Sequence, residues 1–583
     1  MIDADAGKSK TESDTQLPFE FEVSVQIIDR PRRFLTFESR NTFTNALTGD
    51  KLTRQLESQV SNKRRKIYHE HGNLLNFFTN PSEAVKKTIK KNLEKSKLGP
   101  SSDKDKVSKL ADDVSKVKIS KPAPVKKPAT VSKPKQKINL DLELKKKNEK
   151  PNLSFVVIGH VDSGKSTMTG RLLYDLNIVD SKTLHKLTKE SESIGKASFS
   201  LAWIMDQTSE ERNRGITVDI CQTQFETKQS SFTIIDSPGH KDYVPQMING
   251  VTQADLAIAI IDASSFESGF IADGQTKEHL TIAKSLGIEK CILLINKMDV
   301  VGWSKDRYDE IKGQLTEFLT DELKYVKDDL IFLPASGYLG DNIVKKSKNL
   351  PWYSGSSLIE LLESENKSVN HKIDKKSPFV MTINDVMESS KNDELTVSGR
   401  INSGLIQPGE SISISPSQQT ALIHSITITK SNVGSSLVKN EAQKLAIEGE
   451  FVELKLKKLD NWENIKVGDL CSLANNPIKP CNKFSCELQC FELTRLLLIG
   501  TPFVMFRNNI SIPARLSSIE LVNGKKNKKK HLRSNTVSTV TIEILERDMP
   551  LLTFGENKKL GRVVIRKDGF TVAAGKILDL LHE

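Results

Sequence analysis

A glycine-rich segment of this 583-residue chain has the residue types and spacing needed to hold a phosphate chain. It fits the pattern G-x-x-x-x-G-K-[ST] and reads Gly159, His160, Val161, Asp162, Ser163, Gly164, Lys165, Ser166 and Thr167. The glycines let backbone N–H groups turn inward around a β-phosphate, and a following helix adds partial positive charge. Lys165 is placed to bridge the β- and γ-phosphates, and the Ser166 hydroxyl to ligate Mg²⁺. The segment therefore predicts a P-loop for a nucleoside triphosphate.

A second motif, Asn296-Lys-Met-Asp299, indicates which base is bound. The Asp299 carboxylate can accept hydrogen bonds from the N1–H and N2–H₂ groups of guanine, a donor pair that adenine lacks. Binding of adenine would leave this carboxylate desolvated and without a hydrogen-bond partner. A penalty of this kind supports discrimination of guanine over adenine by about 10⁴ or more. Asn296 would tie this loop to the P-loop, and the stem of Lys297 would lie over the purine. Ser336 and Gly337, which follow the next apolar run, would close over the base. GTP and GDP are the expected ligands.

Two further segments supply groups for the γ-phosphate. In the first, Asp236 would reach Mg²⁺ through a water molecule, and the Gly239 N–H would sense the γ-phosphate. His240 directly follows and is placed to orient a water molecule for in-line attack, so it is the candidate catalytic residue. In the second segment, the Thr217 hydroxyl would be the second protein ligand of Mg²⁺, beside Ser166. Both segments should be ordered by the γ-phosphate and released after hydrolysis, which predicts a switch.

Short apolar runs place these motifs at the ends of strands. The runs are Ser154–Ile158, Phe232–Ile235, Leu256–Ile261, Cys291–Ile295 and Leu330–Leu333. Because helical stretches lie between them, residues 151–370 are expected to form an α/β domain with a mainly parallel sheet. After residue 370 short strand-like runs between Gly, Pro and Ser turns predominate. They predict two small antiparallel β-barrels, at residues 371–480 and 481–583.

The excess positive charge lies in the first quarter of the chain. The formal net charge is +12, and residues 1–150 contain 33 basic and 20 acidic residues. Residues 98–150 are rich in Lys, Pro and Ser and have no aromatic residue, so we expect a disordered linker. Residues 1–97 are expected to be partly ordered at most, with one strand around residues 19–25. The sequence thus predicts a near-neutral globular body with a largely disordered basic N-terminal extension.

Several classes of protein are disfavoured. The N-terminus shows no secretory signal, and the longest apolar runs are far shorter than the roughly 20 residues that cross a bilayer. Six cysteines in so long a chain, none in a C-x-x-C pair, predict neither a disulfide framework nor a zinc site. Cys486 and Cys490 alternate with apolar residues and are expected to be buried thiols. We therefore expect a cytoplasmic protein that binds neither a membrane nor DNA.

Residues 151–583 resemble the translational GTPases of the elongation factor Tu and elongation factor one-alpha family. Within that family they are similar to the fungal Hbs-type ribosome-rescue GTPases, which partner Pelota. The segments that carry the resemblance are Arg171–Ile178, Ser200–Asp206, Glu211–Thr217, Gly269–His279 and Gly561–Asp568. Two positions depart from the family, since Ser163 and Ser237 stand where relatives usually have a small residue such as Ala.

The resemblance implies a role in ribosome rescue during mRNA surveillance, in no-go and non-stop decay. Such a GTPase delivers a release-factor-like Pelota protein to the empty A site of a stalled ribosome. Hydrolysis of GTP then lets the partner accommodate and the ribosomal subunits separate. Ribosomal RNA contacts are expected from the basic extension and from the lysine cluster at residues 525–530, and these would weaken steeply with salt.

Three alternatives stay open. Elongation factors that carry aminoacyl-tRNA begin almost directly at the G domain, and termination GTPases usually have an extension rich in Gln, Asn, Tyr and Gly. A relative of the rescue factors instead bridges the cytoplasmic RNA exosome to its mRNA feeder through its N-terminal region. The complete nucleotide motifs argue against an inactive GTPase, yet residues 1–150 could give an active one an exosome contact as well.

Overall fold

The computed structural model describes residues 24–28, 34–38, 139–206, 208–270, 274–368, 376–388, 394–428, 442–459, 461–526 and 530–582. The chain divides into two units, Met1–Lys126 and Lys127–Glu583. In the first unit, β1 (Ser24–Ile28) pairs antiparallel with β2 (Phe34–Glu38). The strand expected around residues 19–25 overlaps β1 only at its end. The remainder of the expectations for residues 1–138 lies outside the described residues.

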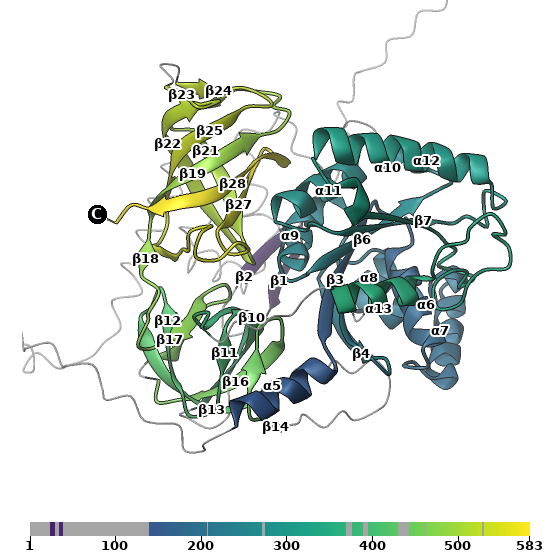
Figure 1. Ribbon diagram of the computed structural model, residues 1–583, viewed down its shortest axis with the longest axis horizontal. Coiled ribbons are helices and arrows are strands. Elements are labelled where there is room, and N and C mark those ends of the chain that lie inside the picture. The colour runs from purple at the N-terminus through teal and green to yellow at the C-terminus, as the bar shows by residue number, and fades with distance from the viewer. Residues whose placement is uncertain are drawn as a thin grey trace, which may run out of the picture. The chain divides into compact units, whose positions relative to one another are not determined.

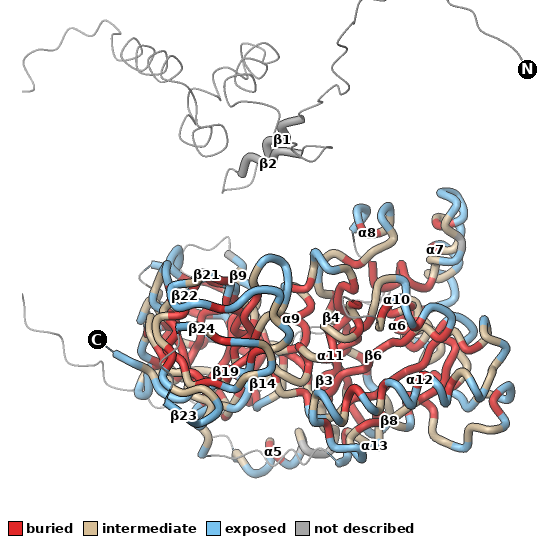
Figure 2. Tube along the Cα trace, turned by 90° about the horizontal axis from the view of Figure 1, so that it is seen from above, coloured by how far each residue is buried: buried red, intermediate tan, exposed pale blue. Residues whose placement is uncertain are grey.

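The second unit contains a six-stranded sheet in the order β4-β5-β3-β6-β7-β8. Its strands are β3 (Asn152–Gly159), β4 (Cys221–Glu226), β5 (Ser231–Asp236), β6 (Leu256–Asp262), β7 (Cys291–Asn296) and β8 (Leu330–Pro334). Only β4 runs antiparallel to its neighbour, and the other pairs are parallel. Parallel strands covered on both faces need continuous apolar runs, and the strands β3 and β6 are buried along nearly their whole length (Figure 2). The predicted α/β domain is therefore confirmed.

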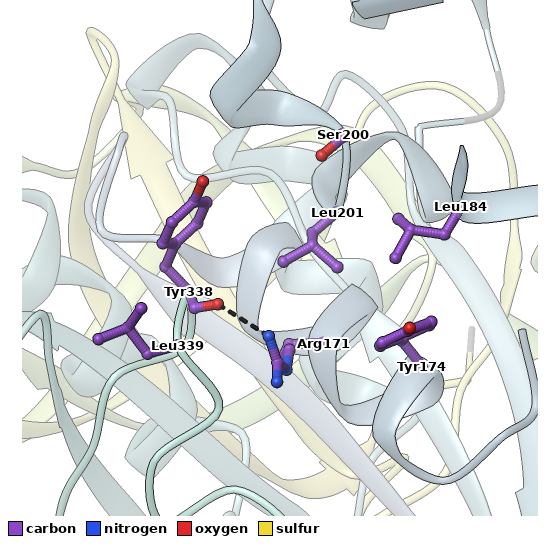
Figure 3. Close-up of a pocket in the computed structure, with 7 residues that line it drawn as sticks. All are labelled: Arg171, Tyr174, Leu184, Ser200, Leu201, Tyr338 and Leu339. Carbon is purple, nitrogen blue, oxygen red and sulfur yellow. Dashed lines mark hydrogen bonds between the residues drawn. The ribbon is translucent and has the colours of Figure 1, made fainter. Parts of the chain in front are cut away.

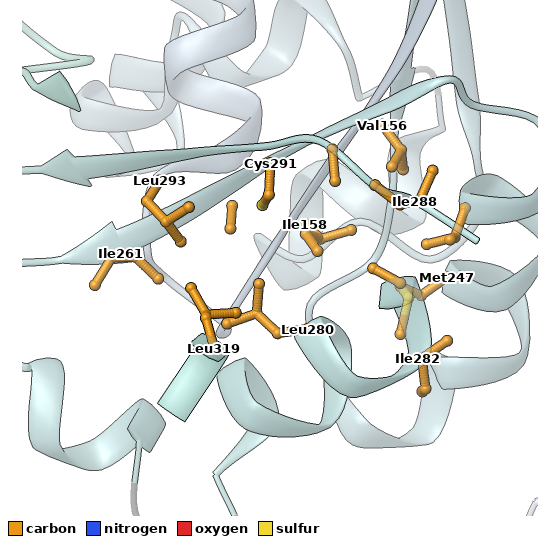
Figure 4. Packing of buried hydrophobic residues seen from close by; sticks show 14 of the residues in the cluster. Val156, Ile158, Met247, Ile261, Leu280, Ile282, Ile288, Cys291, Leu293 and Leu319 are labelled. Carbon is orange, nitrogen blue, oxygen red and sulfur yellow. The ribbon is translucent and has the colours of Figure 1, made fainter. Parts of the chain in front are cut away.

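Helices cover both faces of this sheet. They are α6 (Lys165–Asp175), α7 (Ser181–Ser193), α8 (Ser209–Arg214), α9 (Val244–Thr252), α10 (Phe266–Phe270), α11 (Gln275–Ser285), α12 (Lys305–Glu317) and α13 (Leu358–Ser368). Side chains of α9, α11 and α12 pack in one buried cluster, and those of α6, α7 and α13 in another. Figure 4 shows the first cluster, where Ile158 and Leu293 of the sheet lie near Met247 and Leu280 of the helices. This packing places the N-termini of the helices at the edge of the sheet where the sequence motifs lie.

Two closed six-stranded antiparallel barrels follow, as predicted (Figure 1). The first consists of β9 (Val380–Glu388), β10 (Glu394–Ser403), β12 (Ser411–Ser415), β13 (Gln419–Ile428), β16 (Phe451–Lys457) and β17 (Leu470–Leu473). The second consists of β19 (Lys483–Cys490), β21 (Pro502–Arg507), β22 (Ile510–Val522), β25 (Val537–Ile544), β27 (Arg562–Lys567) and β28 (Phe570–Leu580). Closure occurs through the pairs β12–β13 and β21–β22. Closure pairs every strand of the two six-stranded rings on both sides, and β14 (Ala442–Gln443) and β23 (Lys525–Lys526) extend the two sheets at one end.

Short strands complete the two barrels. They are β11 (Leu405–Ile406), β14 (Ala442–Gln443), β15 (Ala446–Ile447), β18 (Pro480–Cys481), β20 (Leu497–Leu498), β23 (Lys525–Lys526), β24 (His531–Leu532) and β26 (Met549–Pro550). All six cysteines are buried free thiols, which confirms the expectation for Cys486 and Cys490. Within the described ranges, no helix has both the length and the apolar character required to span a bilayer. The domain limits expected at residues 370 and 480 stay predictions.

One segment contradicts the expected disordered linker at residues 98–150. Its last part forms the helix α5 (Leu140–Glu149), which begins at Asn139, whose side chain accepts a hydrogen bond from the Leu142 N–H. Leu144 is buried in a small cluster with residues of the first barrel, Leu445 and Ile447. Lys147 Nζ lies 2.5 Å from Glu450 Oε1 of that barrel. The cap, the apolar contact of Leu144 and the ion pair of Lys147 with Glu450 together hold this helix against the first barrel.

We expect Leu144→Ala to loosen α5, since truncation of a buried leucine costs about 2 kcal/mol or more. Leu142→Ala is the matched control, because the Leu142 side chain on the same helix is 52% exposed. Hydrogen exchange of the amides at residues 140–149 should accelerate in the first variant and stay unchanged in the second. Equal exchange in both variants would show that the Leu144 contact does not hold α5.

Candidate nucleotide site and catalytic loop

The P-loop lies between β3 and α6, where the sequence predicted it. Gly164 caps α6 with φ of 91°, and a Cβ at this position would lie 2.5 Å from the Asn296 amide nitrogen, so only glycine fits. Lys165 is buried and donates hydrogen bonds to the carbonyl oxygens of Gly159 (3.1 Å) and His160 (2.7 Å). Burial lowers the pKa of Lys165 to about 8. A cation held in so dry a loop is suited to an anionic ligand.

The loop after β7 is tied to the P-loop as the sequence argument expected. Asn296 Nδ2 donates to the Ser163 carbonyl oxygen at 2.8 Å, and Lys297 Nζ donates to the Asp162 carbonyl oxygen at 2.8 Å. Lys297 also pairs with the Asp262 carboxylate at 2.7 Å, a partner at the end of β6 that the motif did not indicate. Asp299 is half-buried in the same turn. The hydrogen bonds of Asn296 and Lys297 hold this turn beside the P-loop.

The base-closing loop joins the same network. The Gly337 N–H donates to Asn296 Oδ1 at 2.8 Å, and the Ser336 hydroxyl accepts from the Leu339 N–H at 3.2 Å. From α6, Arg171 Nη1 donates to the Tyr338 carbonyl oxygen at 3.2 Å (Figure 3). A pocket of about 270 Å³ adjoins this bond, lined by Arg171, Tyr174, Leu184, Ser200, Leu201, Tyr338 and Leu339. The helix that starts at the P-loop thus also supports the loop predicted to cover the base.

The predicted magnesium ligands converge. The hydroxyl oxygens of Ser166 and Thr217 are 3.1 Å apart, although they are separated by 51 residues. Asp236 is fully buried, and its carboxylate oxygens have no hydrogen-bond partner within the described part of the chain. Burial raises its pKa to about 6, despite the neighbouring Ser166 hydroxyl and the Lys165 ammonium. Burial and the Asp236 charge also raise the pKa of Asp206 to about 7. The buried Asp236 carboxylate beside the two hydroxyls fits a hard divalent cation.

Thr217 is positioned by a buried acid that the motifs did not reveal. α8 begins with a capping box in which Glu211 accepts hydrogen bonds from the N–H and the hydroxyl of Thr208. The other oxygen of Glu211 accepts from the Val218 N–H at 3.1 Å. One side chain therefore clamps both ends of the segment that carries Thr217.

His240, the predicted catalytic residue, lies in the loop of residues 236–240 between β5 and the short turn Lys241–Tyr243, and we call this loop the catalytic loop after that prediction. Its side chain is 33% exposed, and Nδ1 accepts a hydrogen bond from the Asp242 N–H at 3.3 Å. A neutral imidazole with Nδ1 as acceptor carries its proton on Nε2. The Gly239 position admits no side chain, since a Cβ there would overlap the Lys165 ammonium. The loop therefore brings the Gly239 backbone against the P-loop and leaves His240 near the surface.

Two residues of α11 support this arrangement and were missed by sequence reasoning. With its amide nitrogen facing these two acceptors, Gln275 donates to His160 Nδ1 at 2.6 Å and to the Gly239 carbonyl oxygen at 3.1 Å. His279 is fully buried, and its Nδ1 accepts from the Gly159 N–H at 3.3 Å. Burial lowers the pKa of His279 to about 3, so it remains neutral. Both residues lie in the segment 269–279 that carries the family resemblance, but their types and spacing did not indicate a role.

The two departures from the family pattern, Ser163 and Ser237, differ in their contacts. The Ser237 hydroxyl donates to the Val157 carbonyl oxygen of β3 at 2.6 Å, which attaches the catalytic loop to the sheet. The Ser163 hydroxyl is buried and has no hydrogen-bond partner among the described residues. The roles assigned to all the site residues stay predictions, but their positions form one contiguous site at the carboxyl ends of β3, β5, β6, β7 and β8.

Comparison with known proteins gives two family matches and several relatives. Residues 150–389 match the elongation factor Tu GTP binding domain, and residues 483–578 match the GTP-eEF1A C-terminal domain-like family. The chain is 36% identical over 447 residues to protein HBS1 of Drosophila melanogaster, which covers 75% of this chain and 64% of that protein. It is 32% identical over 461 residues to the elongation factor 1 alpha-like protein of Schizosaccharomyces pombe, covering 78% and 75% of the two chains.

A solved structure shares the fold. The Ski7 GTPase-like domain of S. cerevisiae, bound to GDP and inorganic phosphate, matches with a TM-score of 0.66 at 24% sequence identity. The match covers 75% of this chain and 99% of that one. It shows that the arrangement of one α/β domain and two barrels is shared.

We expect the unmodified protein to bind GTP and not ATP, and Asp299→Asn to shift the preference from guanine toward xanthine nucleotides. The amide would place a donor against guanine N1–H, so GTP affinity should fall by about 10² or more while xanthine nucleotides bind better. Asp309→Asn, on the exposed face of α12, is the control and should change neither affinity. Titration with GTP, ATP and XTP checks the prediction. Comparable affinities of the unmodified protein for ATP and GTP would contradict it.

Proposed function

The chain belongs to the elongation factor Tu and elongation factor 1-alpha family of translational GTPases, and on this basis we propose that it serves ribosome rescue. In this proposal it delivers a Pelota-type, release-factor-like partner to stalled ribosomes in the cytoplasm, and GTP hydrolysis then permits the subunits to separate. The similarity to protein HBS1 and the basic extension support this role over that of an aminoacyl-tRNA carrier. Because the chain covers 64% of the length of protein HBS1, the partner and the pathway are part of the proposal.

One observation supports GTP hydrolysis in this proposal, namely that Ser166, Thr217 and Asp236 lie close together. These residues come from the P-loop and from the two predicted switch segments, and would hold Mg²⁺ with the two hydroxyls and, through water, with the carboxylate. When bound, Mg²⁺ neutralises charge on the β- and γ-phosphate oxygens. Lys165 adds a positive charge at the same place. Ordering of the Thr217 and Asp236 segments therefore depends on a ligand that carries a γ-phosphate.

His240 would orient the attacking water. Its Nδ1 contacts the N–H and the carboxylate of Asp242 and its ring lies 6.0 Å from that of Tyr243, while Nε2 has no hydrogen bond to any described residue and can take another partner. The side chain is partly exposed, so a surface outside the chain can position it. Slow hydrolysis by the isolated protein and strong stimulation by ribosomes with the Pelota-type partner follow from this exposure.

We expect His240→Ala to separate hydrolysis from binding. It leaves Lys165, Ser166 and Thr217 in place, so GTP affinity should change little, while ribosome-stimulated hydrolysis should drop by at least about 10². Lys165→Ala is the contrasting variant, since loss of the buried cation should weaken nucleotide binding itself. Nucleotide titration and single-turnover hydrolysis on both variants test the distinction. If His240→Ala hydrolyses GTP at the unmodified rate on ribosomes, the catalytic assignment is wrong.

The identity of the partner needs a separate experiment. The full chain carrying His240→Ala, trapped with GTP, should retain a Pelota-type protein and stalled ribosomes. Recovery of aminoacyl-tRNA would instead support an elongation factor, and recovery of a termination factor would support a termination GTPase. The proposed exosome contact through residues 1–150 is tested in parallel, by comparing exosome subunits recovered with the full chain and with a chain that lacks residues 1–138.

A further inference from the structure

The last residue of β6, Asp262, lies beside the motif that is predicted to bind guanine. In the parallel pairing of β6 with β7, Asp262 is opposite Asn296, the first residue of that motif. The Ala263 N–H also donates to the Asn296 carbonyl oxygen at 3.0 Å. The two strand ends therefore place Asp262 next to Lys297, although 35 residues separate them in the sequence.

Four hydrogen bonds fix the Asp262 carboxylate. Its Oδ1 accepts from the N–H and the hydroxyl of Ser264, at 2.8 and 2.6 Å. Its Oδ2 accepts from the Ser265 hydroxyl at 2.8 Å and from the Lys297 ammonium at 2.7 Å. The Asp262 side chain is 10% exposed. Burial raises the pKa of Asp262, but the hydrogen bonds from Lys297 and the two serines outweigh it, so the pKa lies below its usual value and the carboxylate stays charged.

Lys297 is held at both ends of its side chain. Its backbone has φ of 59°, a left-handed conformation that is unfavourable for a residue with a side chain and that surrounding contacts must maintain. Its ammonium donates to the Asp162 carbonyl oxygen of the P-loop as well as to Asp262. A lysine stem ordinarily samples many rotamers, and fixing both of its ends confines this one to a single path.

The charge of Asp262 by itself would act against a phosphate ligand. This charge reaches the P-loop, since burial and the Lys165 charge lower the pKa of His160 and the Asp262 carboxylate is one of the groups that oppose this lowering. A negative charge near the P-loop repels an anionic nucleotide. Asp262 is therefore suited to holding Lys297 in place and not to attracting the ligand.

We propose that Asp262 is a positioning residue that sets how long a guanine nucleotide stays bound. The inference rests on the proposed nucleotide site, in which the stem of Lys297 lies over the purine. Because its ammonium is bound to Asp262 and to the Asp162 carbonyl oxygen, the stem stays across the face of the purine, and the nucleotide leaves only after the stem has moved. Loss of the Asp262 charge frees this cover and leaves the contact of Asp299 with the edge of the base intact. Release of the nucleotide then becomes faster, while the choice of base is kept.

Asp262→Asn in the full chain tests this role, since the amide keeps the shape of the side chain and removes its charge. Stopped-flow measurements with fluorescent GDP and a fluorescent non-hydrolysable GTP analogue should show release of both accelerated by about tenfold, the scale of one lost hydrogen bond between charged groups. By electrostatics alone, removal of a negative charge beside an anionic ligand would slow its release, so the direction of the change separates positioning from charge. Glu267→Gln is the matched control and should leave release unchanged, because the Glu267 carboxylate is 59% exposed and pairs with Arg307 instead.

Two comparisons distinguish an effect through Lys297 from a general loosening of the domain. Inosine diphosphate has the same purine face as GDP but lacks the 2-amino group at its edge, so Asp262→Asn should accelerate the release of both by the same factor. In a Lys297→Met background, Asp262→Asn should add less than about twofold, because the ammonium through which it acts is gone. Thermal unfolding measured in parallel shows whether Asp262→Asn folds. If it does not, Ser265→Ala removes one donor to the same carboxylate from an exposed position, and faster GDP release then supports the proposal while an unchanged rate overturns it.

The outcomes separate this proposal from the proposed function. Release from Asp262→Asn no faster than from Glu267→Gln, an acceleration that inosine diphosphate does not share, or one that persists in full with Lys297→Met would overturn the role of Asp262 and leave the GTPase role intact. Faster release from Asp262→Asn, with unchanged single-turnover hydrolysis on ribosomes at saturating GTP, supports it. Failure of the unmodified chain to bind GTP would overturn both.

Discussion

The cost of burying charge governs the nucleotide site. Lys165 and Asp236 are both buried, and their pKa values are displaced toward neutrality to about 8 and about 6. Burial therefore makes the ionised form of each group less favourable than it is in water, and each is stabilised when a ligand of the opposite charge arrives. The phosphates satisfy the lysine, and a divalent cation satisfies the carboxylate. The site therefore suits a ligand that supplies both phosphates and a divalent cation. We expect its loops to change conformation when part of that ligand leaves.

Sheet topology makes such a concentration of charge possible. Parallel strands bring their carboxyl ends to one edge, so loops far apart in the sequence meet there. Asn296 reaches the Ser163 carbonyl oxygen across 133 residues, and Ser166 meets Thr217 across 51. Side chains of the helices packed on the two faces also hold these loops. Arg171 of α6, for example, donates a hydrogen bond to the Tyr338 carbonyl oxygen. The loops of the site are therefore held by contacts between residues that are far apart in the sequence.

Sequence reasoning succeeded where a function is encoded in adjacent residues. The P-loop and the Asn296–Asp299 motif carry their geometry in their own spacing, and apolar runs place them at strand ends. The expected disorder of residues 98–150 was wrong for α5, since the contact of Leu144 with Leu445 depends on a barrel surface about 300 residues away. Gln275 and His279 were missed for a similar reason. Their partners are the His160 ring and backbone atoms of Gly159 and Gly239 in distant loops, and no spacing within α11 indicates them.

Asp255 is a further example of a residue whose contacts the sequence spacing does not indicate. It pairs with Arg400 and Lys559, 145 and 304 residues further along the chain, so no local pattern connects the three. Yet the argument that applies to Lys165 and Asp236 applies here too, because a buried charge ties its neighbours together only while the geometry is right. At the nucleotide site the missing charge comes from the ligand, whereas at Asp255 it comes from Arg400 and Lys559 of the two barrels.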